Sequence, residues 1–569
     1  MKKMKRVMLL TVSAILVLAT VLAGCSSSDK GNKEPAPTTP PATGNGDNGG
    51  DTKENDTSKG EDGKWVLGDK PLSFTMYAHY DDVDFPAWDS TPAGKWLKEN
   101  KQVDIKMITA SGNSAQKMSA MIAGDELPEV IWTSRNHPDV EQLREHGKLV
   151  PFDDYLDKYP NLKTWMSDLN ILRADDGKLY QFPNWYTGRP MGNAGYAINK
   201  KIYKELGSPV LETTEDLYKY LVAVKEKYGD KIVPFEPHRA VDAQGFGVLY
   251  TAFGEGDQAL YSYLNSGMLA VPKDGKMTSI FTDPIFREAN KYIAKLYREK
   301  LTSQEAFNQT TDRVEEKVLN GRVAVYAGAN PTDYASKGHK ELTKTDPDAG
   351  YFMIWPIHKP GLDKNKIFPG TYTSLGWNAS VITTAAKDPE AIFAFLDWYT
   401  GPEGQNLQFF GPEGGNWDGF DENGQPNFTA NYDAAEVQDI QNKNEKVMIN
   451  GNTSYIDPAK MKYENSKPEE EQNWMARYQS TITWPTQYNV TEFINLDPPK
   501  DSDLGAIRQS IVDLFLQVYA NVITNSKSDE EVDQMLDQAE KDAQQLGYNK
   551  LLDFRTERWQ ANKAKLAGK

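Results

Sequence analysis

The chain has 569 residues and a formal net charge of −17 at pH 7, with 81 acidic against 64 basic side chains. That acidity argues against nucleic-acid binding, which needs a basic surface to displace counterions, and against broad docking on anionic lipid. One cysteine excludes an intrachain disulfide, so the core must hold by burial alone. A chain of this length can bury such a core in two or more lobes.

Residues 1–24 have the pattern of a secretory signal peptide. Four basic side chains between residues 2 and 6 precede the apolar run 7–19, which is too short for a mature membrane span. The following Leu-Ala-Gly-Cys, residues 22–25, resembles the bacterial lipobox, in which cleavage leaves a diacylglycerol-bearing cysteine as the first residue. We therefore expect Cys25 to be lipidated rather than buried as a core thiol. Removal of the signal takes four basic residues and no acidic ones, which gives a mature net charge of −21.

Residues 26–64 contain almost no apolar side chains and are rich in Gly, Pro, Ser, Thr, Asn and charge. Such a segment cannot bury enough surface to fold, so we expect 25–64 to be the lipidated cysteine followed by a disordered tether. As a flexible coil it would span roughly 35 Å root-mean-square. No later run of about 18 apolar residues suggests another membrane segment.

From Trp65 the sequence alternates between strand and helix patterns. We expect strands at 71–77, 103–108 and 128–132, with helices at 94–100 and 115–123 between them. This order is typical of a parallel sheet with helices on both faces.

Three later helical regions are well marked. Thr213-Thr-Glu-Asp216 predicts a capping box at the start of one helix. Asp388-Pro389 predicts an N-cap followed by a helix-starting proline, and Gly401-Pro402 ends that helix. From Asp503 onward the pattern is mostly helical.

Motifs of catalysis are missing from the sequence. It contains no Walker phosphate loop, no Gly-x-Ser-x-Gly and no His-Glu-x-x-His, and the single cysteine excludes thiol catalysis and cysteine-based zinc sites. Acid pairs such as Asp153-Asp154 are typical of solvated loops. Two carboxylates about 5–10 Å apart would nevertheless suffice for a glycosidase. A secreted carbohydrate-active enzyme, hydrolase or lyase, therefore stays open, and so does a surface adhesin or chaperone.

Several segments in the right order resemble the extracellular solute-binding proteins of bacterial ABC importers (family 1, LplA-like oligosaccharide-binding lipoproteins). These segments are LPEVIW (127–132), GKLVPFDDY (147–155), GKLYQFP (177–183), GYAINK, YKELG and TTEDLY (195–218), GRVAVY (321–326), and DPEAIFAFLD with GPEG (388–404). The resemblance covers the chain from Pro71 to its end. It implies a non-enzymatic protein that captures an oligosaccharide and delivers it to ABC permease subunits.

The resemblance also implies an α/β, periplasmic-binding-protein-like (type II) fold, in which each of two lobes is a mixed, mostly parallel sheet flanked by helices. We expect lobe 1 at 65–192 plus 375–425, and lobe 2 at 193–374 plus 426–569. Hinge closure around the ligand would be the mechanism. The implied location is the outer face of the membrane of a Gram-positive cell, with a monomer held through its lipid anchor only.

Ligand residues in such a fold lie on loops at the carboxyl ends of strands, and a sugar site combines aromatic platforms with hydrogen-bonding side chains. By that test we expect ligand contacts from Tyr80, Asp81, Trp132, Ser134, Arg135, Trp185, Tyr186, His238, Trp355, Tyr372, Trp377 and Trp417. The strongest candidate is Trp132, which should end its strand. Most Trp residues of a large protein are core residues, and Trp96, Trp398 and Trp559 fall in helical stretches.

Many relatives carry a calcium loop of alternating Asp and Asn after the helix that begins near residue 213. Here residues 225–235 read Lys-Glu-Lys-Tyr-Gly-Asp-Lys-Ile-Val-Pro-Phe, which lacks those ligands. We therefore expect no calcium at this position and no cofactor. The sequence identifies no other metal site, and metal binding elsewhere stays open.

Overall fold

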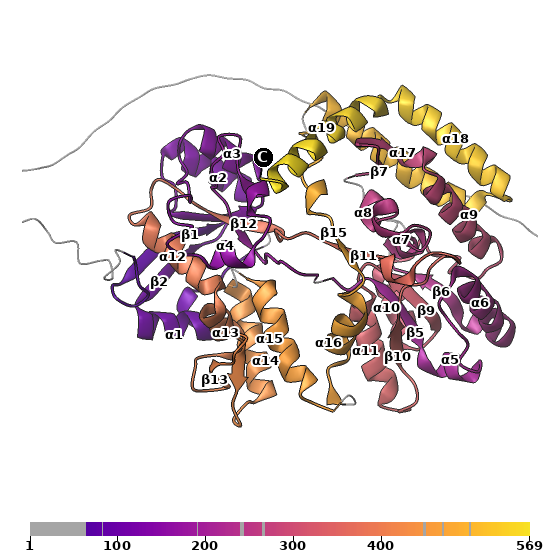
Figure 1. Cartoon of the computed structure of the whole chain (residues 1–569), viewed down its shortest axis with the longest axis horizontal. Helices are drawn as coiled ribbons and strands as arrows, with labels where there is room; N and C mark the ends of the chain where they lie inside the picture. The colour runs from indigo at the N-terminus through magenta and orange to yellow at the C-terminus, as the bar shows by residue number, and fades with distance from the viewer. Residues whose placement is uncertain are drawn as a thin grey trace, which may run out of the picture. The chain divides into compact units, whose positions relative to one another are not determined.

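The computed structural model describes residues 64–568 except 82, 191, 239, 241–243, 265–267, 448–450, 469–470 and 500–501. The predictions of a signal peptide, of a lipidated Cys25 and of a tether lie outside the described residues, apart from Lys64. The described residues belong to one compact unit. It contains two sets of elements, each with its own sheet and core, which we call the first lobe and the second lobe (Figure 1).

The first lobe is built on a five-stranded sheet of order β2-β1-β3-β12-β4. Its strands are β1 (Leu72–Ala78), β2 (Val103–Ile108), β3 (Val130–Ser134), β4 (Phe182–Asn184) and β12 (Asn378–Ile382). β1 pairs in parallel with β2 and β3, whereas β12 runs antiparallel between β3 and β4. Four of the five strands therefore point the same way.

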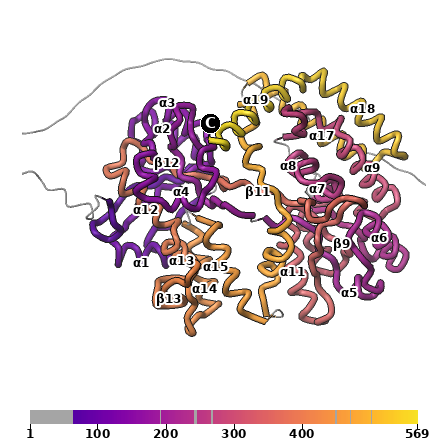
Figure 2. Tube along the Cα trace, viewed as in Figure 1, coloured from indigo at the N-terminus to yellow at the C-terminus, as the bar shows by residue number. Residues whose placement is uncertain are grey.

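The first lobe also contains eight of the described α-helices and a hairpin. The helices are α1 (Pro92–Lys101), α2 (Ser114–Gly124), α3 (Pro138–Glu145), α4 (Asn161–Trp165), α12 (Pro389–Thr400), α13 (Pro402–Phe410), α14 (Ala434–Asn444) and α15 (Thr453–Asn465), and the hairpin pairs β13 (Trp417–Phe420) with β14 (Pro426–Phe428). Helix α14 lies beside α1 (Figure 2). The Asn444 Oδ1 accepts the backbone N–H of Ala93 at 3.0 Å. The first lobe thus extends to Asn465, beyond the boundary expected at residue 425.

The second lobe is built on a four-stranded sheet of order β10-β5-β9-β6. Its strands are β5 (Gly195–Asn199), β6 (Val233–Pro237), β9 (Val323–Gly328) and β10 (Tyr351–Ile354), with a separate hairpin of β7 (Ala270–Lys273) and β8 (Lys276–Ser279). β5 runs antiparallel to its neighbours β9 and β10, while β6 and β9 are parallel.

Helices cover this second sheet and extend the lobe. They are α5 (Lys200–Glu205), α6 (Thr214–Tyr228), α7 (Gln244–Thr251), α8 (Tyr261–Leu264), α9 (Pro284–Arg298), α10 (Thr311–Leu319), α11 (Pro331–Thr343), α16 (Trp474–Tyr478), α17 (Asp503–Asn525), α18 (Asp529–Gln545) and α19 (Tyr548–Leu566). The last three confirm the helical C-terminus and pack on α9 and β8 (Figure 1). None of the described helices combines the length and the apolar character that a membrane span requires.

The elements expected from the sequence are present, with ends shifted by up to two residues. The capping box of α6 is complete: the backbone N–H of Asp216 donates to Thr213 Oγ1 at 3.1 Å, and that of Thr213 donates to Asp216 Oδ2 at 3.0 Å. Asp388 caps α12, and Gly401 ends it. One shift matters for the site: β3 continues to Ser134, so Trp132 stands in the middle of its strand and does not end it.

Three segments join the two lobes: 185–194 between β4 and β5, 355–377 between β10 and β12, and 466–473 between α15 and α16. The second carries β11 (Gly370–Tyr372), which pairs with β15 (Gln487–Asn489). A backbone hydrogen bond ties the first two segments together, from the N–H of Thr187 to the carbonyl of Ser374 at 2.9 Å. The chain therefore passes between the two lobes three times, and more than one linker connects them.

Candidate functional site

The strand directions place the candidate residues at one edge of each sheet. In the first lobe, β1, β3 and β4 end at the edge where the antiparallel β12 begins. In the second lobe, β6, β9 and β10 end at the edge where β5 begins. The segments 185–194 and 355–377 connect these two carboxyl edges, which is where open α/β sheets bind ligands.

An aromatic cluster lies at the edge of the first sheet and consists of Tyr80, Phe85, Trp132 and Trp377. Measured between ring centroids, Tyr80 lies 4.9 Å from Trp132 and 5.6 Å from Trp377, and Trp132 lies 5.8 Å from Trp377. All three pairs meet edge to face. Trp132 is only 5% exposed, whereas Trp377 is 56% exposed. Trp132 therefore supports the cluster from within, and Trp377 presents its ring to solvent.

Polar groups border the aromatic cluster. Ser134 Oγ donates to the Tyr80 hydroxyl at 3.3 Å, and the backbone N–H of Arg135 donates to the Trp377 carbonyl at 3.2 Å. The Arg135 guanidinium also donates to the carbonyl of Gly376, and burial lowers the pKa of this side chain to about 10. The structure thus brings together Tyr80, Trp132, Ser134, Arg135 and Trp377.

The strand register adds a residue that the sequence did not single out. Asn378, the first residue of β12, stands between Ser134 on β3 and Asn184 on β4. Its side chain is fully buried, and neither of its amide polar atoms has a hydrogen-bond partner among the described residues. A buried amide in this state ordinarily bonds water or a ligand. Neither Asn378 nor Phe85 carried a sequence signal, because only strand pairing and ring packing bring them to the cluster.

Asp81 is turned toward a helix and away from the aromatic cluster. Its Oδ1 accepts the backbone N–H of Ser114 at 2.7 Å, at the start of α2. That hydrogen bond is the largest cause that lowers the pKa of Asp81. The carboxylate therefore caps α2, as favoured at a helix N-terminus.

Three other aromatic candidates of the first lobe pack elsewhere. Tyr186 is fully buried and Trp417 is 2% exposed, with its indole N–H donating to the Gly411 carbonyl at 2.8 Å. These two are core residues in this structure, a correction to the expectation that each touches ligand. Trp185 is half-buried beside Phe409 and has a φ of 55°, an unusual backbone conformation for a bulky residue. It lies where the chain leaves β4.

The remaining candidates lie at the carboxyl edge of the second sheet and in the connecting segment 355–377. His238 follows β6, and its Nδ1 lies 2.7 Å from the Tyr326 hydroxyl. Trp355 follows β10, and its indole N–H donates to the Lys364 carbonyl at 2.9 Å. Tyr372 ends β11 opposite Asn489, and burial raises the pKa of its hydroxyl. All three side chains are partly exposed, but none belongs to the aromatic cluster.

Arg189, which sequence reasoning missed, lies in the segment between β4 and β5. Its guanidinium stacks 4.4 Å above the Trp484 ring. Burial lowers the pKa of Arg189, and the charge of Asp457 opposes that effect. This cation–π contact joins the connecting segment 185–194 to the chain between α16 and β15.

Two pockets lie away from the aromatic cluster. One, of about 1000 Å³, is lined by residues of both lobes and carries basic and acidic side chains, among them Arg144, Glu141, Arg558 and Asp497. The other, of about 850 Å³, includes Trp65, Trp96, Trp398 and the buried Trp417. Neither is lined by a member of the aromatic cluster.

Residues 225–231 do not gather calcium ligands. The one aspartate there, Asp230, forms an ion pair with Lys225, with 2.6 Å between the carboxylate oxygen and the ammonium nitrogen. The structure does, however, bring three ligand-type side chains together in the first lobe: His79, His137 and Asp139. No sequence spacing indicated this set, because His79 and His137 lie on separate loops that meet only when β1 pairs with β3.

The chain is similar to known transport proteins. The family model described as bacterial extracellular solute-binding protein matches residues 83–406. The fructooligosaccharide ABC transporter substrate-binding protein FusA of Streptococcus pneumoniae serotype 4 is 28% identical over 250 residues, 40% of this chain and 45% of FusA. The polygalacturonan/rhamnogalacturonan-binding protein YtcQ of Bacillus subtilis is 23% identical over 424 residues, 71% of this chain and 73% of YtcQ.

The solved structures establish the fold. The crystal structure of S. pneumoniae FusA in complex with kestose matches 87% of this chain and all of its own, with a TM-score of 0.58 and 20% identity. An extracellular solute-binding protein from Bifidobacterium longum subsp. infantis matches 89% of this chain with a TM-score of 0.62 and 16% identity. The expected two-lobe, periplasmic-binding-protein-like fold is thereby confirmed.

Proposed function

Because the chain belongs to the bacterial extracellular solute-binding proteins, we propose that it captures an oligosaccharide outside the cell and delivers it to the membrane subunits of an ABC importer. The sequence match spans less than half of FusA, so the ligand is argued from the site itself. The names of FusA and YtcQ, a fructooligosaccharide binder and a polygalacturonan/rhamnogalacturonan binder, support the ligand class and not a particular sugar.

The exposed ring of Trp377 is the observation that carries this proposal. A large hydrophobic side chain that is 56% exposed at a ligand-binding sheet edge, and held by Tyr80 and Trp132, is a ready platform for the apolar face of a sugar ring. Ser134 and Arg135 border it and offer hydrogen-bonding groups for hydroxyl groups.

Ligand contacts from both lobes would couple binding to closure. Under this proposal His238, Trp355 and Tyr372 supply the second half of the site, and the segments 185–194 and 355–377 act as the hinge. Ligand that touches both lobes in the closed state favours that state. Small-angle scattering of the purified protein should then show a smaller radius of gyration with ligand than without it.

Binding of a defined panel of fructo-, galacto-, xylo- and pectic oligosaccharides, measured by calorimetry, tests the proposal. We expect saturable binding of at least one member and no cleavage of any. Binding of free amino acids or short peptides in place of every sugar would overturn it. Cleavage of a glycosidic bond that survives repurification would favour the alternative, a carbohydrate-active enzyme, while a protein that binds polymer surfaces but no soluble fragment would favour an adhesin.

The same proposal includes the location of the protein. A lipidated Cys25 would hold a monomer on the outer face of the cell membrane, and the polar segment 26–64 would let the folded part reach its permease. Two acyl chains are enough for stable anchoring, at about 0.8 kcal/mol for each buried CH₂. No catalytic step or cofactor is part of this function.

A further inference from the structure

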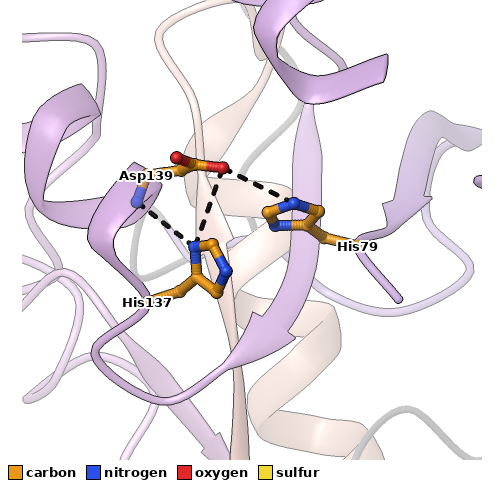
Figure 3. Close-up of side chains that lie close together, drawn as sticks. All are labelled: His79, His137 and Asp139. Atoms are coloured by element: carbon orange, nitrogen blue, oxygen red, sulfur yellow. Dashed lines mark hydrogen bonds and ion pairs between the residues drawn. The ribbon is translucent and has the colours of Figure 1, made fainter. Parts of the chain in front are cut away.

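Three ligand-type side chains converge at the carboxyl edge of the first sheet (Figure 3). His79 follows β1, while His137 and Asp139 lie at the start of α3, on the loop after β3. Asp139 Oδ2 lies 3.5 Å from His79 Nε2 and 3.7 Å from His137 Nδ1. One donor atom from each residue lies within 4.8 Å of the other two.

A hydrogen bond orients His79 for coordination. His79 Nδ1 lies 3.2 Å from the hydroxyl of the buried Thr133, which leaves Nε2 facing Asp139. A ring nitrogen fixed by a partner on the far side of the imidazole is the usual arrangement around metal-bound histidine. His137 Nδ1 uses its one lone pair to accept the backbone N–H of Asp139 at 3.2 Å, so coordination through this atom would replace that hydrogen bond.

Direct hydrogen bonds account poorly for the same geometry. The two nitrogen–carboxylate distances, 3.5 and 3.7 Å, exceed the usual range for N–H···O bonds. They are close to the separation of about 3.4 Å between two ligands of a tetrahedral zinc ion bound at about 2.0–2.1 Å. A small contraction would therefore fit a cation between the three groups.

We propose that His79, His137 and Asp139 form a binding site for a divalent transition cation, for which Zn²⁺ is the probe. Two imidazoles and one carboxylate are a ligand set that Zn²⁺ accepts, and with three protein ligands a water molecule completes the coordination. His79 is almost fully buried, whereas the side chains of His137 and Asp139 are 31% and 27% exposed, which leaves access from the solvent side.

Such an ion would clamp the loop after β1 to the loop after β3. Both loops adjoin the aromatic cluster: Tyr80, a member of it, directly follows His79, and Arg135, which bonds to the Trp377 carbonyl, lies two residues before His137. The bound cation would thus stiffen the edge of the sheet that carries the cluster. This inference does not depend on the identity of the transported solute.

A zinc titration of the full chain, freed of any affinity tag and treated with chelator, tests the site. We expect one equivalent of Zn²⁺ to bind in competition with a chelating dye, and Zn²⁺ to raise the melting temperature. His137→Ala and Asp139→Asn should each weaken binding by at least about 100-fold, since even outer-sphere partners of metal ligands contribute about 10–100-fold. Both variants should lose the thermal shift.

His146→Ala is the matched control, because His146 is exposed, directly follows the last residue of α3, and its Nδ1 lies 2.7 Å from the Gln142 carbonyl. This variant should bind like the wild type. Co²⁺ should give the visible absorption of a four-coordinate site in the wild type and in His146→Ala only. The site is refuted if the wild type binds no stoichiometric Zn²⁺. It is also refuted if His137→Ala and Asp139→Asn, shown by circular dichroism to be folded, bind Zn²⁺ as tightly as His146→Ala.

Discussion

At the scale of single residues, Trp377 and Trp132 separate recognition from support. Trp377→Ala removes a ring that is 56% exposed, so we expect a loss of oligosaccharide affinity of about 1–3 kcal/mol with little change in melting temperature. Trp132→Ala removes a ring that is 5% exposed and should also destabilise the protein, by roughly 3–5 kcal/mol. Calorimetry and thermal unfolding of both variants measure the difference.

Trp96→Ala is a suitable control, since Trp96 is a half-buried residue of α1 outside the aromatic cluster. Its affinity should equal that of the wild type. Unchanged affinity in Trp377→Ala would remove the aromatic cluster from the binding site.

Asp397 makes stability depend on pH in an unusual direction. Burial raises the pKa of this carboxyl to about 7, although it accepts the backbone N–H groups of Asn161 and Leu162 at 3.1 and 2.8 Å. Between pH 4 and pH 7 the folded state therefore keeps a proton that the unfolded state has released. The contribution of Asp397 to stability is greatest below pH 4 and falls by about 1.4 kcal/mol for each pH unit up to pH 7.

Denaturant unfolding of Asp397→Asn across that pH range measures this effect. The variant should lack the decline that Asp397 adds to the wild type. Asp157→Asn is the control: Asp157 is exposed and its pKa is lowered, first by its hydrogen bond to Lys163, so its contribution changes only at lower pH. Parallel stability curves for the wild type and Asp397→Asn would contradict the raised pKa.

At the scale of elements, the tight turn before β12 depends on Gly376. Its φ is +63°, and a Cβ atom built there would lie 1.8 Å from the Asn184 carbonyl oxygen. Gly376→Ala therefore combines a backbone penalty of about 1–2 kcal/mol with a steric clash of about 1–3 kcal/mol. Because the Gly376 carbonyl accepts the Arg135 guanidinium, oligosaccharide affinity should fall as well.

Gly361→Ala isolates the backbone part of that cost. Gly361 has a φ of +92°, and nothing lies within 4 Å of its Cβ position. Chemical denaturation should show the smaller loss of stability in this variant and normal affinity. Equal losses in the two variants would mean that the turn before β12 yields to the added methyl group.

The sequence predicts elements well where their signals are local. The alternation in 71–77 and the complete capping box at Thr213 and Asp216 fix β1 and α6 within a residue or so, because hydrophobic period and end-capping act over a few positions. The end of the first lobe, expected at residue 425, could not be predicted from local signals. Helices α14 and α15 carry no local mark of the lobe they join, and only their packing on α1 and α13 assigns them.

Site residues follow the same rule. Tyr80, Ser134, Arg135 and Trp377 could be predicted, since each stands at the end or the start of a strand at the ligand edge. Tyr186 also follows a strand at this edge, but its side chain is buried in the core. Side chains alternate between the two faces of a strand, and β4, with three residues, is too short for that alternation to predict on which side Tyr186 lies. The expected contacts of the candidate residues with ligand stay predictions.

At the scale of the whole molecule, Cys25 is expected to be the only attachment to the membrane. Cys25→Ser should release the protein into the medium, because the variant lacks the thiol that would carry the acyl chains. Fractionation of cells that produce each form, followed by immunoblotting, measures this. A variant that stays in the membrane fraction would refute the lipobox assignment.

The position of β12 bears on how the protein is made and exported. A nascent chain emerges from its N-terminus, yet β3 and β4 have no partner between them until residues 378–382 follow, and the helices that pack on α1 and α13 come later still, up to Asn465. The first lobe therefore cannot finish its sheet during most of synthesis, since the pairing is so distant in sequence. If the chain is exported as the pattern of residues 1–24 predicts, an N-terminal half that cannot fold early could still pass through the translocon, and the complete lobe would form only after export.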